Sequence, residues 1–295
     1  MKSGTVAIIG KPNVGKSTLV NAFVGTKVSI VSRHPATTRF RVHGIKTTQD
    51  YQIVFIDTPG YEESRHRLGE IMKSNVLTTI EDADIMLAVC DGSNFDSHDK
   101  EIMLVVKHSK KPTIAVINKM DKVKPPVLLL LIDRIHNEFG LEEIVPCSAL
   151  TGENIEELEK TIVKLIPEGE MLFPPEYIDS LPQEYRIGEI IREKVFQQVY
   201  QEIPHSVAVE VDEIKPGDKN PQILAIFANI IVEKESQKKI IIGKNGEKLK
   251  LIGSQARHEI EMLVGKKVFL QIRVKVIEKW RDRPDISRRF GYGSI

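Results

Sequence analysis

Short apolar runs alternate with amphipathic segments over about the first 165 residues. Each run has the composition of a buried strand and is followed by a polar turn and a helix-like pattern. The runs are TVAIIG (5–10), YQIVFID (51–57), ADIMLAVCD (83–91), PTIAVINK (112–119) and EIVPCS (143–148). This alternation predicts a mostly parallel sheet with helices on both faces. Residues 42–57 are expected to form two adjacent strands, and therefore one antiparallel edge.

The pattern changes after residue 166. Residues 167–183 carry four prolines, which predicts an extended linker with little regular structure. Beyond it, the periodicity changes between helix and strand in the order α-β-β-α-α-β, ending in a strand over 266–280. We therefore expect an α/β domain over residues 1–166, the linker, and a small α+β domain over 184–295.

Composition restricts the class of protein. The chain has 295 residues, of which 41% are hydrophobic and 28% charged, as in soluble globular proteins. The longest apolar run, 127–132, is too short to span a bilayer, and the N-terminus lacks a signal-peptide core. Cys90 and Cys147 have neither metal-binding nor redox spacing, so we expect core thiols in a reducing cytoplasm.

Charge is distributed unevenly along the chain. Residues 234–295 carry 16 Lys and Arg against 7 Asp and Glu, whereas the other residues carry 26 against 34. A basic C-terminal quarter on an otherwise acidic chain indicates a polyanionic partner. A solvated basic tail is the alternative.

The segment GKPNVGKS follows the first predicted strand and opens a helix. In that context the pattern G-x-x-x-x-G-K-[ST] is a phosphate-binding loop, whose successive backbone N–H groups surround an anion at a helix N-terminus. Lys16 is expected to reach the β- and γ-phosphates, and the Ser17 hydroxyl to bind Mg²⁺. The predicted nucleotide-binding residues here are Gly10, Lys11, Pro12, Asn13, Val14, Gly15, Lys16, Ser17 and Thr18.

Two later segments indicate which base is bound. NKMD, Asn118–Asp121, ends a predicted strand, and the Asp121 carboxylate can accept two hydrogen bonds from guanine but none of this kind from adenine. Such a site can discriminate by on the order of 10⁴-fold. The Lys119 stem is expected over the base. After the next strand comes the guanine-binding set Ser148, Ala149 and Leu150, where a backbone N–H could meet the guanine O6.

DTPG, Asp57–Gly60, ends another predicted strand. Asp57 can hold a water bound to Mg²⁺, the Gly60 N–H can contact the γ-phosphate, and Thr58 and Pro59 complete the segment. In the polar loop ATTRF we choose Thr38, beside Arg39, over Thr37 to complete the metal shell, although a plain surface turn is the alternative. The predicted metal ligands are Ser17, Thr38 and Asp57, and the predicted catalytic residues are Asn13, Lys16, Thr38 and Gly60.

In order and spacing, these motifs resemble the translation-factor-related GTPases. The resemblance implies a Ras-like G domain that cycles between GTP and GDP. Tyr61 follows DTPG, where Ras has a glutamine that orients water. In relatives with PN-x-GKS the asparagine helps to bind potassium, which makes Asn13 a candidate ligand for K⁺; a loop hydrogen bond is the alternative.

A second glycine-lysine loop, GKNG at 243–246, lies between two predicted helices. It lacks the length and the hydroxyl of a nucleotide loop, but G-x-x-G between helices is the clamp of a KH domain, which grips about four backbone nucleotides. Ile240, Ile241, Leu249 and Ile252 are expected to line a groove for bases. The predicted RNA-binding residues are Gly243, Lys244, Asn245, Gly246, Lys248, Lys250, Arg281, Arg283, Arg288 and Arg289.

The α-β-β-α-α-β order is that of a type II KH domain. A G domain, a proline-broken linker and this domain, with the segments GEIIREKVF, EIPHSVAVEV and IGKNGEKLKLIG, resemble the Era family of bacterial ribosome-assembly GTPases. We expect a monomer. The resemblance implies binding near the 3′ end of 16S ribosomal RNA during maturation of the 30S subunit. It leaves open a peripheral association with the inner membrane.

The sequence leaves two main classes of function open. In the first, the protein is a slow GTPase whose nucleotide state controls RNA binding. In the second, it is a binding module in which GTP is a structural ligand. The complete Mg²⁺ and guanine motifs favour the enzyme, whereas Tyr61 in place of the glutamine favours the module. A metabolic sensor with a protein partner is a third class, against which the basic C-terminal quarter argues.

Overall fold

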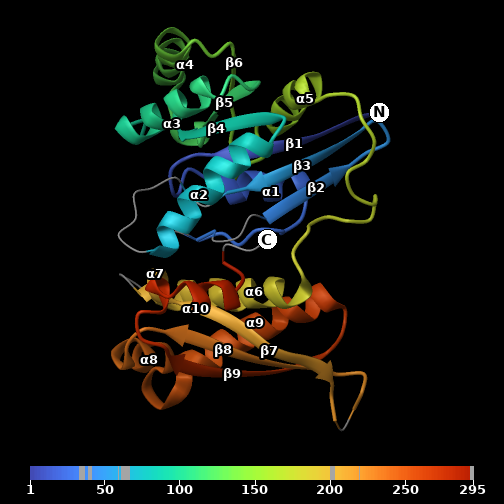
Figure 1. The fold of residues 1–295 in the computed structure, drawn as a ribbon, viewed down its shortest axis with the longest axis vertical. Helices are drawn as coiled ribbons and strands as arrows, with labels where there is room; N and C mark the ends of the chain where they lie inside the picture. Colours follow the sequence, from blue (N-terminus) through green and yellow to red (C-terminus); the bar gives the residue numbers. More distant parts are fainter. Residues whose placement is uncertain are drawn as a thin grey trace. The chain divides into compact units, whose positions relative to one another are not determined.

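The computed structural model describes residues 1–32, 37–38, 42–58, 60, 67–199, 203–218 and 220–292. The chain forms two compact units; the first holds most of residues 1–180, and the second runs from Leu181 onward (Figure 1). Among the described residues, no helix has the length and apolar character needed to cross a membrane.

The first unit is built on a six-stranded sheet of order β2-β3-β1-β4-β5-β6. The strands are β1 (Lys2–Ile9), β2 (Val42–Thr47), β3 (Tyr51–Asp57), β4 (Ile85–Asp91), β5 (Thr113–Asn118) and β6 (Glu143–Pro146). All neighbours are parallel except β2, which pairs antiparallel with β3. The predicted parallel sheet with one antiparallel edge is confirmed. Because β1 lies between β3 and β4, the strand order reverses there, and ligands of such sheets bind at the carboxyl ends beside that reversal.

Helices cover both faces of this sheet, and its central strands are accordingly mostly apolar. One face packs against α1 (Lys16–Val24) and α5 (Ile155–Leu165), and the other against α2 (Arg67–Asp82), α3 (Ser97–His108) and α4 (Pro125–Phe139). Side chains of β1 alternate between the two cores: Val6 and Ile8 face one, and Ala7 and Ile9 face the other. A short 3₁₀ turn, η1 (Met120–Lys122), follows β5. This packing fixes the strand ends from which the site loops leave.

The predicted linker is held against the first unit over much of its length. The buried Gln52 side chain accepts the backbone N–H groups of Leu172 (2.8 Å) and Phe173 (2.9 Å) and donates to the Phe173 carbonyl (2.8 Å). Farther along, the Ile45 N–H of β2 donates to the Ile178 carbonyl at 2.9 Å. Residues 167–180 therefore group with the first unit, and the chain leaves it between Ser180 and Leu181.

The second unit has the predicted α-β-β-α-α-β order. Its elements are α6 (Gln183–Gln198), α7 (Ile203–Ser206), β7 (Ala208–Pro216), β8 (Leu224–Val232), α8 (Glu235–Ile242), η2 (Lys244–Gly246), α9 (Glu247–Val264) and β9 (Val268–Val276). The sheet order is β7-β8-β9, with β7 antiparallel and β9 parallel to β8. Residues of α6, α9 and β8 make the core. The fold class predicted from the sequence is confirmed for both units.

The residues after β9 are folded, although the sequence suggested a basic tail. They form η3 (Trp280–Asp282) and α10 (Pro284–Arg289). The Trp280 ring is buried with Phe290 and Tyr292, at centroid distances of 5.5 and 6.0 Å, and its Nε1 donates to the Ser206 carbonyl at 2.8 Å. Aromatic packing therefore holds this segment on the unit.

We predict that Gln52→Leu will weaken the attachment of the linker. Two partly exposed backbone N–H groups would lose their acceptor, and each such hydrogen bond contributes about 0.5–1.5 kcal/mol to the unfolding free energy. Hydrogen exchange at the amides of Leu172 and Phe173 should speed up accordingly. Gln198→Leu, which removes one 3.4 Å bond in the second unit, is the control. Unchanged exchange at both amides would show that Gln52 does not hold the linker.

Candidate nucleotide and RNA sites

The phosphate-binding loop connects β1 to α1. At two of its glycines, neighbouring atoms leave no room for a side chain. Gly15 has a φ of 100°, and a Cβ there would lie 2.3 Å from the Asn118 Nδ2. A Cβ on Gly10 would lie 2.4 Å from the Val89 carbonyl oxygen. Any side chain at either position would displace the loop or its neighbours, so the loop conformation depends on both glycines.

Lys16 is buried at the start of α1. Its Nζ donates to the carbonyls of Gly10 and Lys11, both at 2.9 Å. Burial lowers the pKa of Lys16 to about 8, although the charge of Asp57 acts in the opposite direction. A phosphate beside this ammonium would favour its charged form, so the loop is suited to an anion.

The three predicted metal ligands lie together. The Ser17 Oγ is 2.8 Å from the Thr38 Oγ1, which donates to the Asp57 Oδ2 at 3.4 Å. Burial raises the pKa of Asp57, and hydrogen bonds from both hydroxyls oppose that rise. The buried Asp57 Oδ1 has no hydrogen-bond partner among the described residues. A carboxylate and two hydroxyls suit Mg²⁺, which prefers hard oxygen ligands and retains waters.

The DTPG segment continues from β3 toward the phosphate-binding loop. The Thr58 Oγ1 donates to the Ile8 carbonyl at 2.7 Å, which ties the segment to β1. A Cβ on Gly60 would lie 2.9 Å from the Pro12 backbone N, so the two backbones approach closely. Pro59, Tyr61 and, in the ATTRF loop, Ala36, Arg39 and Phe40 lie outside the described residues.

Asn118 links the phosphate-binding loop to the segment after β6. Its buried side chain donates to the Val14 carbonyl at 2.7 Å and accepts the Ala149 N–H at 3.0 Å. Ser148 is buried, and its Oγ accepts the Thr151 N–H, while Leu150 is exposed. The predicted guanine motifs are thus joined through one amide.

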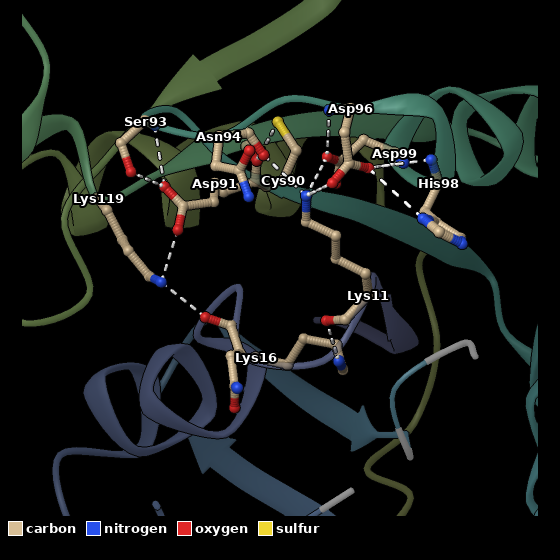
Figure 2. Close-up of polar contacts among 12 residues, drawn as sticks. Lys11, Lys16, Cys90, Asp91, Ser93, Asn94, Asp96, His98, Asp99 and Lys119 are labelled. Carbon is tan, nitrogen blue, oxygen red and sulfur yellow. Dashed lines mark hydrogen bonds and ion pairs between the residues drawn. The ribbon is translucent and has the colours of Figure 1, made fainter. Parts of the chain in front are cut away.

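Lys119 is the second link between the guanine motif and the phosphate-binding loop. Its Nζ donates to the Asn13 carbonyl at 2.6 Å and to the Asp91 Oδ2 at 2.7 Å (Figure 2). Burial acts to raise the pKa of Asp91, but hydrogen bonds from Lys119 and Ser93 outweigh it and lower that pKa. Asp121, in η1, is exposed beside this link.

Lys11 is in the phosphate-binding loop, but its side chain extends away from it (Figure 2). Its Nζ binds the Asn94 carbonyl and the carboxylates of Asp96 and Asp99, at the start of α3. These acidic residues were not among those predicted from the sequence. The pattern D-x-x-D before an apolar helical run could have indicated the helix start, but not the lysine that binds there.

The G-x-x-G loop of the second unit lies at the N-terminus of α9. Gly243 (φ 74°), Asn245 (φ 52°) and Gly246 (φ 78°) all have positive φ. A Cβ on Gly246 would meet nothing within 4 Å, whereas one on Gly243 would lie 2.8 Å from the Lys248 Cβ. Gly246 is therefore open to an approaching backbone, at a helix end that favours anions.

The basic residues of this unit fall into two groups. Lys244, Lys248 and Lys250 make no ion pair with any residue that the structure describes. Arg281 pairs with Glu233 at 2.7 Å, Arg289 with Glu210 at 2.6 Å and Arg283 with Asp285 at 3.2 Å. Arg288 is exposed. Three of the four predicted arginines thus neutralise acidic groups of their own unit, and the lysines beside the loop remain available for phosphate.

The predicted base groove needs a correction. Ile241 and Ile252 are fully buried in the core of the second unit, so neither can touch a base. Ile240 and Leu251 are exposed apolar side chains close to the loop, and Leu249 is partly buried against the core. The sequence showed the apolar run, but one residue along a helix rotates a side chain by about 100°, and the periodicity was too short to decide which isoleucine faces outward.

Comparisons with known proteins agree with this geometry. Residues 5–119 match a family described as 50S ribosome-binding GTPase, and residues 202–281 match the KH domain family. The chain is 49% identical to GTPase Era of Aquifex aeolicus (strain VF5) and 44% identical to GTPase Era of Alkaliphilus metalliredigens (strain QYMF). Each alignment covers 99% of this chain and 99% of the relative.

Two solved structures have the same fold over 99% of both chains. One is Era in complex with MgGDPNP and nucleotides 1506–1542 of 16S ribosomal RNA, with a TM-score of 0.97 and 49% identity. The other is a variant of Aquifex aeolicus Era bound to GDP and AlF₄⁻, with a TM-score of 0.96 and 48% identity. The resemblance seen in the motifs is confirmed over the whole length: this chain belongs to the Era family of GTPases.

Proposed function

We propose that this protein hydrolyses GTP to GDP and binds single-stranded RNA, and that its RNA target is the 3′ end of 16S ribosomal RNA during assembly of the 30S subunit. The observation that carries the nucleotide part is the convergence of the Lys16 ammonium, the Ser17–Thr38–Asp57 oxygens and the Asn118 link at one edge of the sheet. The solved complex of a close relative with MgGDPNP and 16S RNA supports both parts.

In this proposal, each predicted residue has one task. The backbone N–H groups of residues 10–18 and the Lys16 ammonium bind the phosphates. Asp121 accepts hydrogen bonds from guanine, the Lys119 stem lies over the base, and the backbone of Ser148, Ala149 and Leu150 binds the guanine oxygen. Lys11 contributes its main chain, because its side chain is engaged elsewhere.

The metal would be held by Ser17 and Thr38 through their hydroxyls and by Asp57 through a bound water. Bound there, Mg²⁺ supplies charge that offsets the negative charge of the phosphates. The unpartnered Asp57 Oδ1 supports this assignment, since a buried carboxylate oxygen needs a donor or a cation.

Hydrolysis of GTP requires a positioned water and a set of donors around the γ-phosphate. The Gly60 N–H and the Lys16 ammonium are the donors that we assign. Gly60 adjoins the loop at Pro12, so its N–H belongs to the same site as the phosphate. Because Tyr61 stands where Ras has its glutamine, we assign the orientation of water to backbone groups and to a monovalent cation near Asn13.

The RNA part of the proposal rests on the second unit. The Gly243–Gly246 backbone would clamp the RNA backbone, with Lys244, Lys248 and Lys250 supplying charge, Asn245 a polar contact, and Ile240 and Leu251 an apolar surface for bases. Arg288 is the C-terminal arginine best placed to add a phosphate contact, while Arg281, Arg283 and Arg289 would first have to leave their carboxylates.

Several finer expectations stay predictions. They are the domain limits at 166 and 184, a monomeric state, and a peripheral association with the inner membrane. The division between Ser180 and Leu181 supports a two-domain chain in which the linker belongs with the G domain.

We predict that Asp121→Asn will change the preferred base from guanine to xanthine. The carboxylate acceptor becomes an amide that can donate to the second oxygen of xanthine, so affinity for GTP should fall by at least 10²-fold, on the order of what hydrogen-bond mismatches cost. Asp121 is exposed, so the fold should be unaffected. Titration with GTP and XTP measures the change, and Asp133→Asn on α4 is the matched control. Unaltered base preference would remove Asp121 from the base site.

We predict that Gly246→Asp will weaken binding of single-stranded RNA at least tenfold and leave GTP binding unchanged. The new side chain would stand where phosphate approaches, and its charge would repel it. Gly265→Asp is the matched control, because Gly265 also has positive φ (66°) and open space, but lies at the other end of α9. Equal losses of RNA affinity in both variants would assign the effect to backbone strain.

We predict that GTP hydrolysis will be faster in potassium than in sodium buffer, and that Asn13→Ala will reduce the difference. Asn13 has an exposed side chain, and its main chain is fixed by Lys119. Initial rates at equal ionic strength measure the effect. Equal wild-type rates in the two buffers would exclude potassium from the mechanism.

A further inference from the structure

The Lys11 side chain makes its hydrogen bonds outside the nucleotide site. Its Nζ lies 2.7 Å from the Asn94 carbonyl, 2.8 Å from the Asp96 Oδ2 and 2.6 Å from the Asp99 Oδ2. An ammonium has three N–H donors, and three acceptors use all of them. Lys11 therefore has no donor left for a phosphate oxygen while these contacts hold.

The acceptors are themselves held at the start of α3. The Asp96 Oδ1 caps the helix by accepting the N–H groups of His98 and Asp99, and the Asp99 Oδ2 accepts the Asp96 N–H at 3.0 Å. Asp99 is 1% exposed. The ammonium thus binds two carboxylates that are themselves hydrogen-bonded, and it neutralises one that would otherwise be buried without a counter-ion.

The main chain of Lys11 belongs to the phosphate-binding loop. Its carbonyl accepts the Lys16 Nζ at 2.9 Å, next to the Gly10 carbonyl that does the same. Two residues after Lys11, the Asn13 carbonyl accepts the Lys119 Nζ, which also binds Asp91 at the end of β4. Two lysines therefore attach residues 11–13 of the loop to the β4–α3 segment 91–99 (Figure 2).

We propose that Lys11 is a positioning residue for the nucleotide: its contact with Asp96 and Asp99 sets the loop backbone and the resting place of Lys16 before any phosphate arrives. This inference rests on the proposed nucleotide site. A loop fixed in its binding conformation does not have to be ordered when the ligand binds, which raises affinity. Because the same backbone holds the phosphates that GDP and GTP share, both affinities depend on Lys11 equally.

The primary variant is Lys11→Met, which keeps the length of the stem and removes the ammonium. Affinity for mant-GDP and for a mant-labelled GTP analogue should each fall about tenfold, as expected when a loop must be ordered on binding. Lys11→Arg, which keeps a cation, should retain most of the affinity.

A second variant separates positioning from stability. Lys11→Met alone leaves Asp99 buried without a counter-ion and is expected to lower the melting temperature. In Lys11→Met/Asp99→Asn that charge is gone, and an asparagine oxygen can still accept the Asp96 N–H, so the melting temperature should recover. The affinity for mant-GDP should not recover. Lys100→Met, which breaks the α3–α4 pair with Glu138 (3.1 Å), is the control and should bind like wild type.

A third variant covers the case in which neither of these proteins folds. Asp96→Ser keeps an oxygen that can cap α3 and removes one partner of Lys11 at a partly exposed position. It should weaken mant-GDP binding by about two- to threefold, a fraction of the full loss.

Three results would overturn the proposal. They are wild-type affinity in a folded Lys11→Met protein, recovery of affinity together with melting temperature in the double variant, and wild-type affinity in a folded Asp96→Ser protein. The proposed nucleotide site is tested separately by Lys16→Ala: if that variant keeps full affinity, the site itself is wrong. If Lys16→Ala loses binding while Lys11→Met does not, only the role of Lys11 fails.

Discussion

The nucleotide site depends on one buried amide. Asn118 binds the Val14 carbonyl of the phosphate-binding loop on one side and the Ala149 N–H on the other. Gly15 has to lack a side chain so that this amide can reach the loop. A buried amide group left without a partner costs about 1–3 kcal/mol. A shift of the phosphate-binding loop, of Asn118 or of the segment at Ala149 would therefore break a hydrogen bond to one of the other two. The spacing between the phosphate-binding loop and the predicted guanine motifs is therefore fixed by Asn118.

The rest of the phosphate-binding loop is also held by polar contacts with segments at the ends of neighbouring strands. In a parallel sheet the carboxyl ends of neighbouring strands lie at one edge, so side chains from β4 and β5 can hold a loop that follows β1. Lys119 does so with an ammonium that bridges to Asp91, and Asn118 does so with an amide. Lys11 acts in the opposite direction, since its ammonium extends from the loop to Asp96 and Asp99. Lys16 alone is held by carbonyls of its own loop, and its lowered pKa shows that this environment stabilises its charge poorly. Among these lysines, it is the one for which a phosphate would be the better partner.

The sequence predicts much of this arrangement because each motif combines a residue type with a position in the fold. GKPNVGKS, DTPG and NKMD each follow a strand, and parallel strands must bring those ends together. The partners of Lys11 could not be predicted, because a long flexible side chain can extend in any direction and Asp96 and Asp99 are 85 and 88 residues away. The arginines after β9 were assigned to phosphate on charge alone, and charge does not show that Glu210 and Glu233 lie within reach. Nor could prolines reveal that Gln52 binds the linker, since that contact spans about 120 residues.

The position of β2 bears on how the nucleotide and RNA sites communicate. This edge strand begins four residues after Thr38, whose hydroxyl lies among the predicted metal ligands. Its outer side is paired with the linker, through the Ile45–Ile178 hydrogen bond and an antiparallel bridge between Gly44 and Asp179. A strand paired on both sides cannot shift its register without breaking one set of bonds. Any nucleotide-dependent pull on Thr38 therefore acts on a strand that also holds the segment leading to the KH domain. Coupling free energies are reciprocal, so RNA that altered the attachment of the linker would change nucleotide affinity through the same bonds.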